Sequence, residues 1–349
     1  MHKRKLLHLA SALLAAGVIA ATAGCTPRYW GITASALKRT LPIPAPIEGD
    51  AAGGEYGICR ISVMNLREEG AYEAEAATQT LMGSVVRVLD HKNGWAMVST
   101  PEGYVAWVTE GSLFFTDEAG VISWKARPRL IVTSRHATLL SAPKKGSAIV
   151  RDAVRGCIVA NLGPTGKYFK CRLPDGAEAY IARRDAAPCR EYFESQHPTG
   201  EDIVAAAEQY MGIPYMWGGT SINAVDCSGL TQRTYMDCGI LLPRNASQQA
   251  RSGDEVDISG GWGNLQPGDL LFFGRPRQGG GTSIYHVAIY IGDGQIIHSC
   301  AGRVQIAGII AGRANYFAGS SNIVCARRML GCEDCGKGVW SILANGWYF

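Results

Sequence analysis

The sequence reads D-C-S-G-L at residues 226–230 and H-V-A-I-Y-I-G-D-G-Q-I-I-H at residues 286–298. In the first segment, glycines on both sides of Cys227 predict a loop that leads into a helix over 228–237. A cysteine at the start of a helix lies near the positive end of the helix dipole and near free backbone N–H groups. Both favour the thiolate over the thiol, and the N–H groups could stabilise an oxyanion. Alone, however, this short motif is more typical of a small buried cysteine.

The second segment predicts a β-hairpin, because apolar residues alternate on both sides of a turn at 292–294. His286 and His298 lie six positions on either side of Gly292, so a hairpin folded about Gly292 would place them opposite each other. Directly opposed residues have Cβ atoms about 4.5–5.5 Å apart, so we expect the two imidazoles to be in contact. One could act as general base for the thiol while the other orients it, as in a Cys-His-polar triad.

Zinc binding is the alternative interpretation of one cysteine and two histidines. The spacing argues against it, because the ligands would come from a helix start and a hairpin without a tight ligand pair. The C-x-x-C at Cys332 and Cys335 also lacks a second pair, which favours a local disulfide or buried thiols. We therefore predict no metal and no cofactor.

The N-terminus is typical of an export signal: a basic start, an apolar stretch over 6–21 and small residues up to Cys25. Cleavage before Gly24 would release a secreted protein. The A-G-C ending resembles a bacterial lipobox, in which Cys25 is lipidated, although Thr22 replaces the usual aliphatic residue. We expect an exported lipoprotein on the periplasmic side of the envelope, anchored to the membrane through Cys25. An uncleaved anchor is the third alternative, but the segment is shorter than the usual ~20 apolar residues.

The charge balance excludes a nucleic-acid partner of the usual kind. The chain has 34 Lys and Arg against 30 Asp and Glu, and three of the basic residues lie in the signal segment. The mature chain is then near neutral and has no clustered basic face along its sequence. We expect a monomer.

An internal repeat indicates two small β-barrels between the linker and the second half of the chain. Seven residues recur 73 positions later: Gly83, Trp95, Pro101, Gly103, Ala106, Trp107 and Val108 match Gly156, Tyr168, Pro174, Gly176, Ala179, Tyr180 and Ile181. Tyr104 of the first copy corresponds to Ala177 of the second, so the fold does not require it. Tyr104 is therefore a candidate functional residue.

The motifs from Tyr215 to His298, Y-x-W-G-G, D-C-S-G-L, L-P-R, P-G-D-L-x-F-F and H-V-A-I-Y-I-G-D-G, resemble the NlpC-type family of papain-like cell-wall cysteine peptidases. The resemblance implies that Cys227 is the nucleophile, His286 the base and His298 the orienting residue. It also implies that three residues beside the nucleophile contact the substrate: Tyr215, Asp226 and Ser228.

The repeat before this domain resembles the two N-terminal bacterial SH3-like domains of γ-D-glutamyl-L-diamino acid endopeptidases. In that subgroup an acidic residue and a tyrosine of the first barrel bind the free amine of an N-terminal L-alanine. The segments E-A-A-T-Q-x-x-x-G (75–83) and G-Y-V-A-W (103–107) match it, with Ala106 in place of a glycine. Glu75 and Tyr104 are the candidates, with Glu73 as a rival carboxylate.

We therefore predict a multidomain α+β protein with two SH3-like β-barrels and a papain-like α+β domain. The expected parts are a signal peptide with lipobox (1–25), a linker (26–54), two barrels (55–118 and 119–190), the peptidase domain (195–330) and a tail (331–349). The implied reaction is hydrolysis of the γ-D-glutamyl–diamino acid bond in L-Ala-γ-D-Glu-diaminopimelate or lysine stem peptides of peptidoglycan. The alternatives are a D-alanyl cross-link endopeptidase, an amidase, or a non-catalytic cell-wall-binding lipoprotein.

Overall fold

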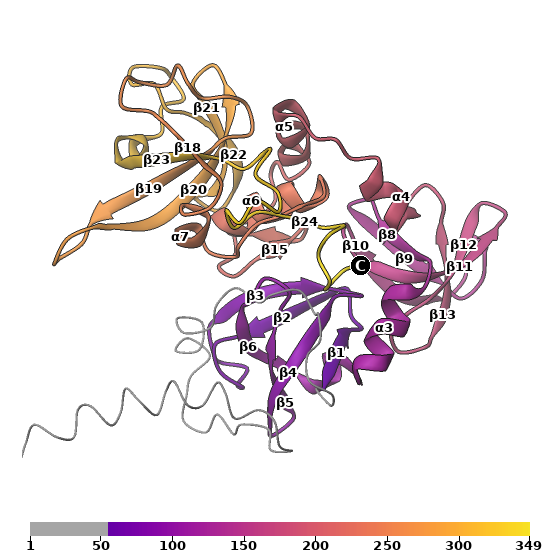
Figure 1. Cartoon of the computed structure of the whole chain (residues 1–349). Coiled ribbons are helices and arrows are strands. Elements are labelled where there is room, and N and C mark those ends of the chain that lie inside the picture. The colour runs from indigo at the N-terminus through magenta and orange to yellow at the C-terminus, as the bar shows by residue number, and fades with distance from the viewer. Residues whose placement is uncertain (1–54) are drawn as a thin grey trace, which may run out of the picture.

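The computed structural model describes residues 55–349, in which two seven-stranded sheets precede an α+β domain (Figure 1). The predicted signal peptide, the linker and Cys25 lie outside the described residues. Among the described residues, no helix is both long enough and apolar enough to cross a membrane.

The first sheet holds the strands in the order β3-β2-β6-β5-β4-β1-β7. Val-, Met- and Ala-rich strand faces pack into its core, which includes Met64, Val86 and Val98. The elements are β1 (Tyr56–Cys59), β2 (Val63–Arg67), β3 (Ala76–Leu81), β4 (Val85–Lys92), β5 (Trp95–Ser99), β6 (Val105–Thr109), the 3₁₀ turn η1 (Glu110–Ser112) and β7 (Leu113–Thr116).

The second sheet has the order β10-β9-β13-β12-β11-β8-β14, which is the first order with seven added to each number. This identity of topology confirms the internal repeat. Its elements are β8 (Arg129–Val132), β9 (His136–Leu140), β10 (Ile149–Val154), β11 (Ile158–Thr165), β12 (Tyr168–Arg172), β13 (Glu178–Ala182) and β14 (Ala186–Pro188). The outer strands of each order are not paired with each other, so each SH3-like unit is an open sheet and not a closed barrel.

Two features join the repeated sheets. Helix α3 (Glu118–Ala126), which the sequence analysis did not predict, connects them, and its Trp124 indole donates a 3.1 Å hydrogen bond to the Gly83 carbonyl. Gly83 has φ +87°, and a Cβ there would lie 2.2 Å from the carbonyl oxygen of Ile158 in the second sheet. The repeated glycine is therefore required by both backbone conformation and close packing.

The α+β domain packs helices on a six-stranded sheet with the order β18-β23-β19-β20-β21-β22. Helix α6 contacts β20 and β21, the strands that carry the two histidines. The helices are α4 (Cys189–Glu194), α5 (Gly200–Glu208), α6 (Cys227–Asp237), α7 (Ala246–Gln249) and the 3₁₀ turn η2 (Ala318–Asn322). The strands are β15 (Thr220–Ser221), β16 (Ala224–Val225), β17 (Ile240–Leu241), β18 (Asp254–Val256), β19 (Leu270–Pro276), β20 (Thr282–Gly292), β21 (Gln295–Cys300), β22 (Arg303–Gly308), β23 (Ile323–Arg328) and β24 (Trp340–Ser341).

The tail ties the three parts together. Strand β24 pairs with β17, and Tyr348 is buried in a cluster that also holds Trp124 of α3 and Met236 of α6. The Arg129 guanidinium of the second sheet donates a 2.6 Å hydrogen bond to the Tyr348 carbonyl. All ten described cysteines are free thiols, including Cys332 and Cys335.

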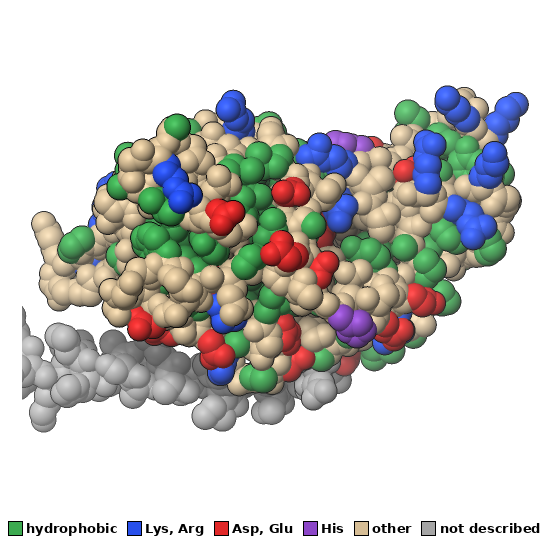
Figure 2. Space-filling view, turned by 90° about the horizontal axis from the view of Figure 1, so that it is seen from above, with side chains coloured by type: hydrophobic (Ala, Val, Ile, Leu, Met, Phe, Trp, Pro, Cys, Tyr) green, Lys and Arg blue, Asp and Glu red, His purple; other side chains and the backbone are tan. Residues whose placement is uncertain are grey.

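Basic side chains gather at the end of the molecule formed by the second sheet (Figure 2). There they line a cavity of about 890 Å³ together with Asp185: Lys145, Lys167, Arg183 and Arg184. The near-neutral charge of the whole chain did not predict this local cluster, because net charge averages over all faces of a protein.

Candidate active site

Cys227 is the first residue of helix α6, one position earlier than predicted. Asp226 caps the helix, since its carboxylate accepts a 2.7 Å hydrogen bond from the Gly229 backbone N–H. Only 8% of Cys227 is exposed, and this burial, together with the charge of Asp226, raises the pKa of its thiol to about 12. Backbone hydrogen bonds from Val287 and Ser228 lower the thiol pKa but do not outweigh burial. Burial therefore opposes the effect of the helix start, which the sequence analysis considered alone.

The two histidines meet as expected, but in a different register. Ile289 pairs with Ile297 and Tyr290 with Ile296, and a bulge follows before Gly292. The pairing is therefore shifted by two residues from the predicted one. Because side chains alternate between faces with a period of two, this shift keeps both imidazoles on one face. They meet diagonally, with 3.0 Å between His286 Nε2 and His298 Nδ1.

Aromatic rings keep the histidine pair dry. The Phe317 ring lies 4.7 Å from the His298 ring and the Phe273 ring lies 5.0 Å from the His286 ring, centroid to centroid. Burial lowers the pKa of His286 to about 3, with a further contribution from His298, and lowers that of His298 to about 4. Both imidazoles are therefore neutral at neutral pH, and one N–H is shared between them.

This geometry suits proton transfer from the thiol during attack. The hydrogen bond between the Val287 backbone and the Cys227 sulfur places the sulfur beside the residue that follows His286. If His286 donates through Nε2 to His298, its Nδ1 lone pair is free to accept the thiol proton. Burial disfavours a resting thiolate–imidazolium pair, so the proton moves as the sulfur attacks.

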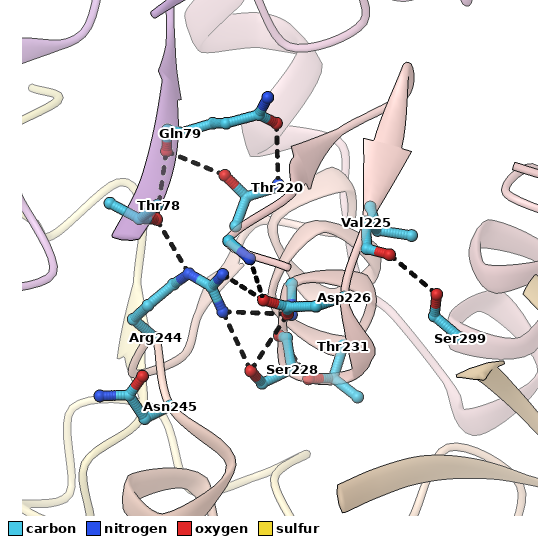
Figure 3. Close-up of polar contacts among 12 residues, drawn as sticks. Thr78, Gln79, Thr220, Val225, Asp226, Ser228, Thr231, Arg244, Asn245 and Ser299 are labelled. Atoms are coloured by element: carbon cyan, nitrogen blue, oxygen red, sulfur yellow. Dashed lines mark hydrogen bonds and ion pairs between the residues drawn. The ribbon is translucent and has the colours of Figure 1, made fainter. Parts of the chain in front are cut away.

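A buried polar network joins Asp226 and Ser228, the residues on either side of the nucleophile in sequence (Figure 3). Arg244 donates 2.6 and 3.1 Å hydrogen bonds to the two carboxylate oxygens of Asp226 and a 3.0 Å bond to the Ser228 hydroxyl. The Gly218 backbone N–H also donates to Asp226, at 2.9 Å. Asp226 and Ser228, predicted to contact substrate, are thus already engaged within the protein. Arg244 was not predicted as a site residue, although its L-P-R motif was noted.

The first sheet forms one wall of this network. Thr78 of β3 accepts a 2.8 Å hydrogen bond from Arg244 Nε. The neighbouring Gln79 accepts two bonds from Thr220, a 3.0 Å bond from its backbone N–H to Oε1 and a 2.8 Å bond from its hydroxyl to the Gln79 carbonyl (Figure 3). Strand β3 therefore lies against the loop that leads to Cys227, and the sheet and the nucleophile form one structural unit.

Tyr104 of the first sheet is close enough to this network to feel its charges. Burial raises the pKa of its hydroxyl, the charges of Glu68, Asp226 and Glu75 raise it further, and Arg244 opposes them. Glu75 is exposed, whereas Glu68 is half-buried and donates its backbone N–H to the Glu75 carbonyl at 3.0 Å. The charges of Glu75, the predicted carboxylate, and of Glu68, which the sequence analysis did not consider, both act on the Tyr104 hydroxyl. Glu73, the rival carboxylate, is exposed.

Tyr215 is also close enough to the nucleophile to feel its charge. Burial raises the pKa of its hydroxyl to about 12, and the charges of Cys227, Asp226 and Cys300 contribute in the same direction. Its backbone N–H donates a 2.8 Å hydrogen bond to the Gly302 carbonyl, which fixes it beside the end of β21.

A cysteine at a helix start, set against a histidine pair on an antiparallel sheet, defines a papain-like cysteine peptidase. Residues 212–318 match the NlpC/P60 family, and residues 66–113 match the bacterial dipeptidyl-peptidase SH3 domain. The chain therefore carries an NlpC/P60 domain and, in its first sheet, this SH3 domain.

Curated relatives extend the similarity across both parts. The chain is 34% identical over 230 residues to a protein of Bacillus cereus named gamma-D-glutamyl-L-lysine dipeptidyl-peptidase, covering 64% of this chain and 66% of that relative. It is 28% identical over 249 residues to dipeptidyl-peptidase 6 of Lysinibacillus sphaericus, covering 69% of this chain and 86% of that relative. The chain thus spans slightly less than two thirds of the first relative.

A solved structure has the same arrangement. The crystal structure of an NlpC/P60 family protein from Bacillus cereus superposes with a TM-score of 0.65 at 26% identity. The match covers 78% of this chain and 99% of that one. The likeness supports the fold of the sheets and the peptidase domain together.

Proposed function

We propose that this protein hydrolyses the γ-D-glutamyl–diamino acid bond of peptidoglycan stem peptides that have a free N-terminal L-alanine. The observation that carries the proposal is the wall of the site formed by the first sheet. The charges of Glu68 and Glu75 act on Tyr104 together with those of Asp226 and Arg244, which lie beside Cys227. The Bacillus cereus and Lysinibacillus relatives, with their dipeptidyl-peptidase names, support the same assignment.

The reaction follows from the geometry of the neutral pair. His286 takes the proton of Cys227 as the sulfur attacks the γ-carbonyl carbon, and backbone N–H groups at the start of α6 stabilise the oxyanion. The protonated His286 then gives this proton to the departing amine of the diamino acid, which leaves a thioester. Water attacks the thioester with His286 as base, and the dipeptide leaves as the free acid. His298 orients the ring of His286 throughout.

Selectivity for a free N-terminus follows from charge. An ammonium group placed against Tyr104 gains a favourable interaction with the nearby carboxylates, which an acetylated terminus cannot make. We assign this interaction to Glu68 and Glu75, whose charges act on the Tyr104 hydroxyl.

The test uses synthetic L-Ala-γ-D-Glu-diaminopimelate and its N-acetyl form. We expect cleavage only at the γ-D-glutamyl bond and a kcat/KM at least ~100-fold higher for the free amine. The Cys227→Ala variant should lose at least ~1000-fold in kcat. Equal cleavage of the two substrates would remove the amine-binding role, and undiminished cleavage by Cys227→Ala would refute the mechanism.

Carboxylate variants locate the amine site. Glu68→Gln should lower kcat/KM on the free amine by roughly tenfold or more and leave the acetylated substrate unaffected, because only the charge is removed. Glu69→Gln is the matched control, since Glu69 is adjacent and exposed. Faster cleavage of D-alanyl cross-links than of this peptide would favour the cross-link endopeptidase. Wall binding without cleavage would favour a non-catalytic lipoprotein.

We also propose that the protein is exported and anchored by a lipid on Cys25. The support is the order of basic, apolar and small residues in 1–25. In cells, the native chain should fractionate with membranes and Cys25→Ser should not. Identical fractionation of both forms in the soluble fraction would refute the anchor.

A further inference from the structure

The histidine pair has a third neighbour that the peptidase mechanism does not use. Cys300 follows His298 by two residues on β21 and is half-buried. The observed strand register, extended by three residues, sets Cys300 across from His286. One ring nitrogen of each histidine and the Cys300 sulfur all lie within 4.8 Å of one another.

An independent observation points to a missing ligand. The Nε2 atom of His298 is buried and has no hydrogen-bond partner in the described part of the chain, and the residue is 0% exposed. A buried polar atom without a partner destabilises the folded state. The other ring nitrogen bonds to His286, so His298 keeps one ring nitrogen that could bind a ligand.

The donor set selects the class of ligand. Two imidazoles and one thiolate suit Zn²⁺, which binds nitrogen at about 2.0–2.1 Å and sulfur at about 2.3 Å in tetrahedral sites. In a tetrahedral site these bond lengths place the donor atoms roughly 3.3–3.6 Å apart. Side-chain rotations that move the donor atoms by about 1 Å would bring the three donors to these distances. Three protein ligands would leave the fourth position to water. The zinc alternative considered from sequence used Cys227, whereas the structure clusters Cys300 with the histidines.

We propose that His286, His298 and Cys300 form an inhibitory Zn²⁺ site that switches the peptidase off. On binding, the Cys300 thiol releases its proton to solvent, and each neutral imidazole binds through a lone pair and keeps its proton on the other nitrogen. No electron is transferred. Zn²⁺ then occupies the base and its orienting partner, so the Cys227 proton has no acceptor. The inhibitory role rests on the proposed peptidase function; the binding site does not.

Binding is measured first, without substrate. The chelator-treated full-length protein is titrated with Zn²⁺ against a chromogenic chelator, and with Co²⁺ to record thiolate-to-metal charge-transfer absorption. We expect one ion per chain. Cys300→Ser should lose the absorption band and weaken Zn²⁺ binding at least ~100-fold. Mutating a residue that merely hydrogen-bonds to a metal ligand already lowers metal affinity about 10–100-fold, and Cys300 is itself a ligand. Cys227→Ala should bind as the native protein does.

Cys325→Ser is the matched control, because Cys325 is also a half-buried free thiol but lies on β23 outside the cluster. It should leave binding unchanged. Native affinity in Cys300→Ser, or a loss in Cys227→Ala instead, would overturn the assignment. In the activity assay, Zn²⁺ should inhibit the native enzyme, while Cys300→Ser should keep its basal rate and resist the metal. If no peptide is cleaved, the proposed function fails while the binding result still stands.

Discussion

Removing the Arg244 side chain should lower the free energy of unfolding by about 3 kcal/mol, because it leaves the buried carboxylate of Asp226 without its counter-charge. The side chains of Arg244 and Asp226 are only 4% and 7% exposed, and Arg244 donates four hydrogen bonds to Asp226, Ser228 and Thr78. Breaking such a buried pair from one side typically costs about 3–5 kcal/mol. Asp226 would keep the N–H donors of Gly218 and Gly229, which places Arg244→Met near the lower limit.

The assay is urea unfolding of the full-length chain, followed by tryptophan fluorescence. The exposed pair of Arg172 and Glu178 supplies the control, and Arg172→Met should cost less than about 1 kcal/mol. The double variant Asp226→Asn/Arg244→Met should lose less than the sum of its single changes, with a coupling of about 2 kcal/mol or more. A loss for Arg244→Met no larger than that for Arg172→Met would refute the argument.

Three further predictions follow from burial and backbone geometry. Because burial lowers the pKa of His286 to about 3, the acid limb of kcat/KM should lie well below pH 6.5, and a half-maximal rate near 6.5 would contradict a neutral buried base. Both histidine pKa values are lowered on folding, so the unfolded chain binds protons first and stability falls as the pH drops from about 6.5 towards 3. In the His298→Asn variant, Tm should fall less steeply as the pH drops. Parallel plots of Tm against pH for the native protein and the variant would show that the His298 pKa does not set the pH dependence. Gly83→Ala should cost more than about 2 kcal/mol, because strain at φ +87° adds to the clash with Ile158. Gly94→Ala, with φ +80° and no atom within 4 Å of its Cβ, should show the strain alone; equal losses in denaturant midpoint would exclude the clash.

The repeat and the histidine contact could be predicted because both depend on local periodicity. The spacing of glycines and aromatic residues predicted two copies of one β unit, which are the two seven-stranded sheets. The matched glycines Gly83 and Gly156 also share a left-handed φ. The hairpin register was wrong by two residues, because a bulge near the turn cannot be seen in the spacing of His286 and His298. The contact was nevertheless predicted, since an even shift preserves the face.

The surroundings of the site could not be predicted from the same patterns. Thr78 and Arg244 are 166 residues apart, and their contact depends on how a whole sheet docks on the peptidase domain. The same docking brings Tyr104 within reach of the charges of Asp226 and Arg244. Burial outweighs the helix start in setting the pKa of the Cys227 thiol. Sequence spacing reports helix ends and strand faces, but not the depth to which assembled domains bury them.

The hydrogen bonds from Thr220 to Gln79, and from Arg244 to Thr78, limit how the two parts of the gene can recombine with those of other proteins. A recombination event between β14 and α5 would transfer the cysteine and both histidines intact, yet it would separate each of these donors from its acceptor. We therefore expect substitutions on β3 and in the loop before α6 to depend on one another. The two parts should be inherited as a pair, and chimaeras that join this peptidase domain to a foreign sheet should need compensating changes on β3 before they recover activity.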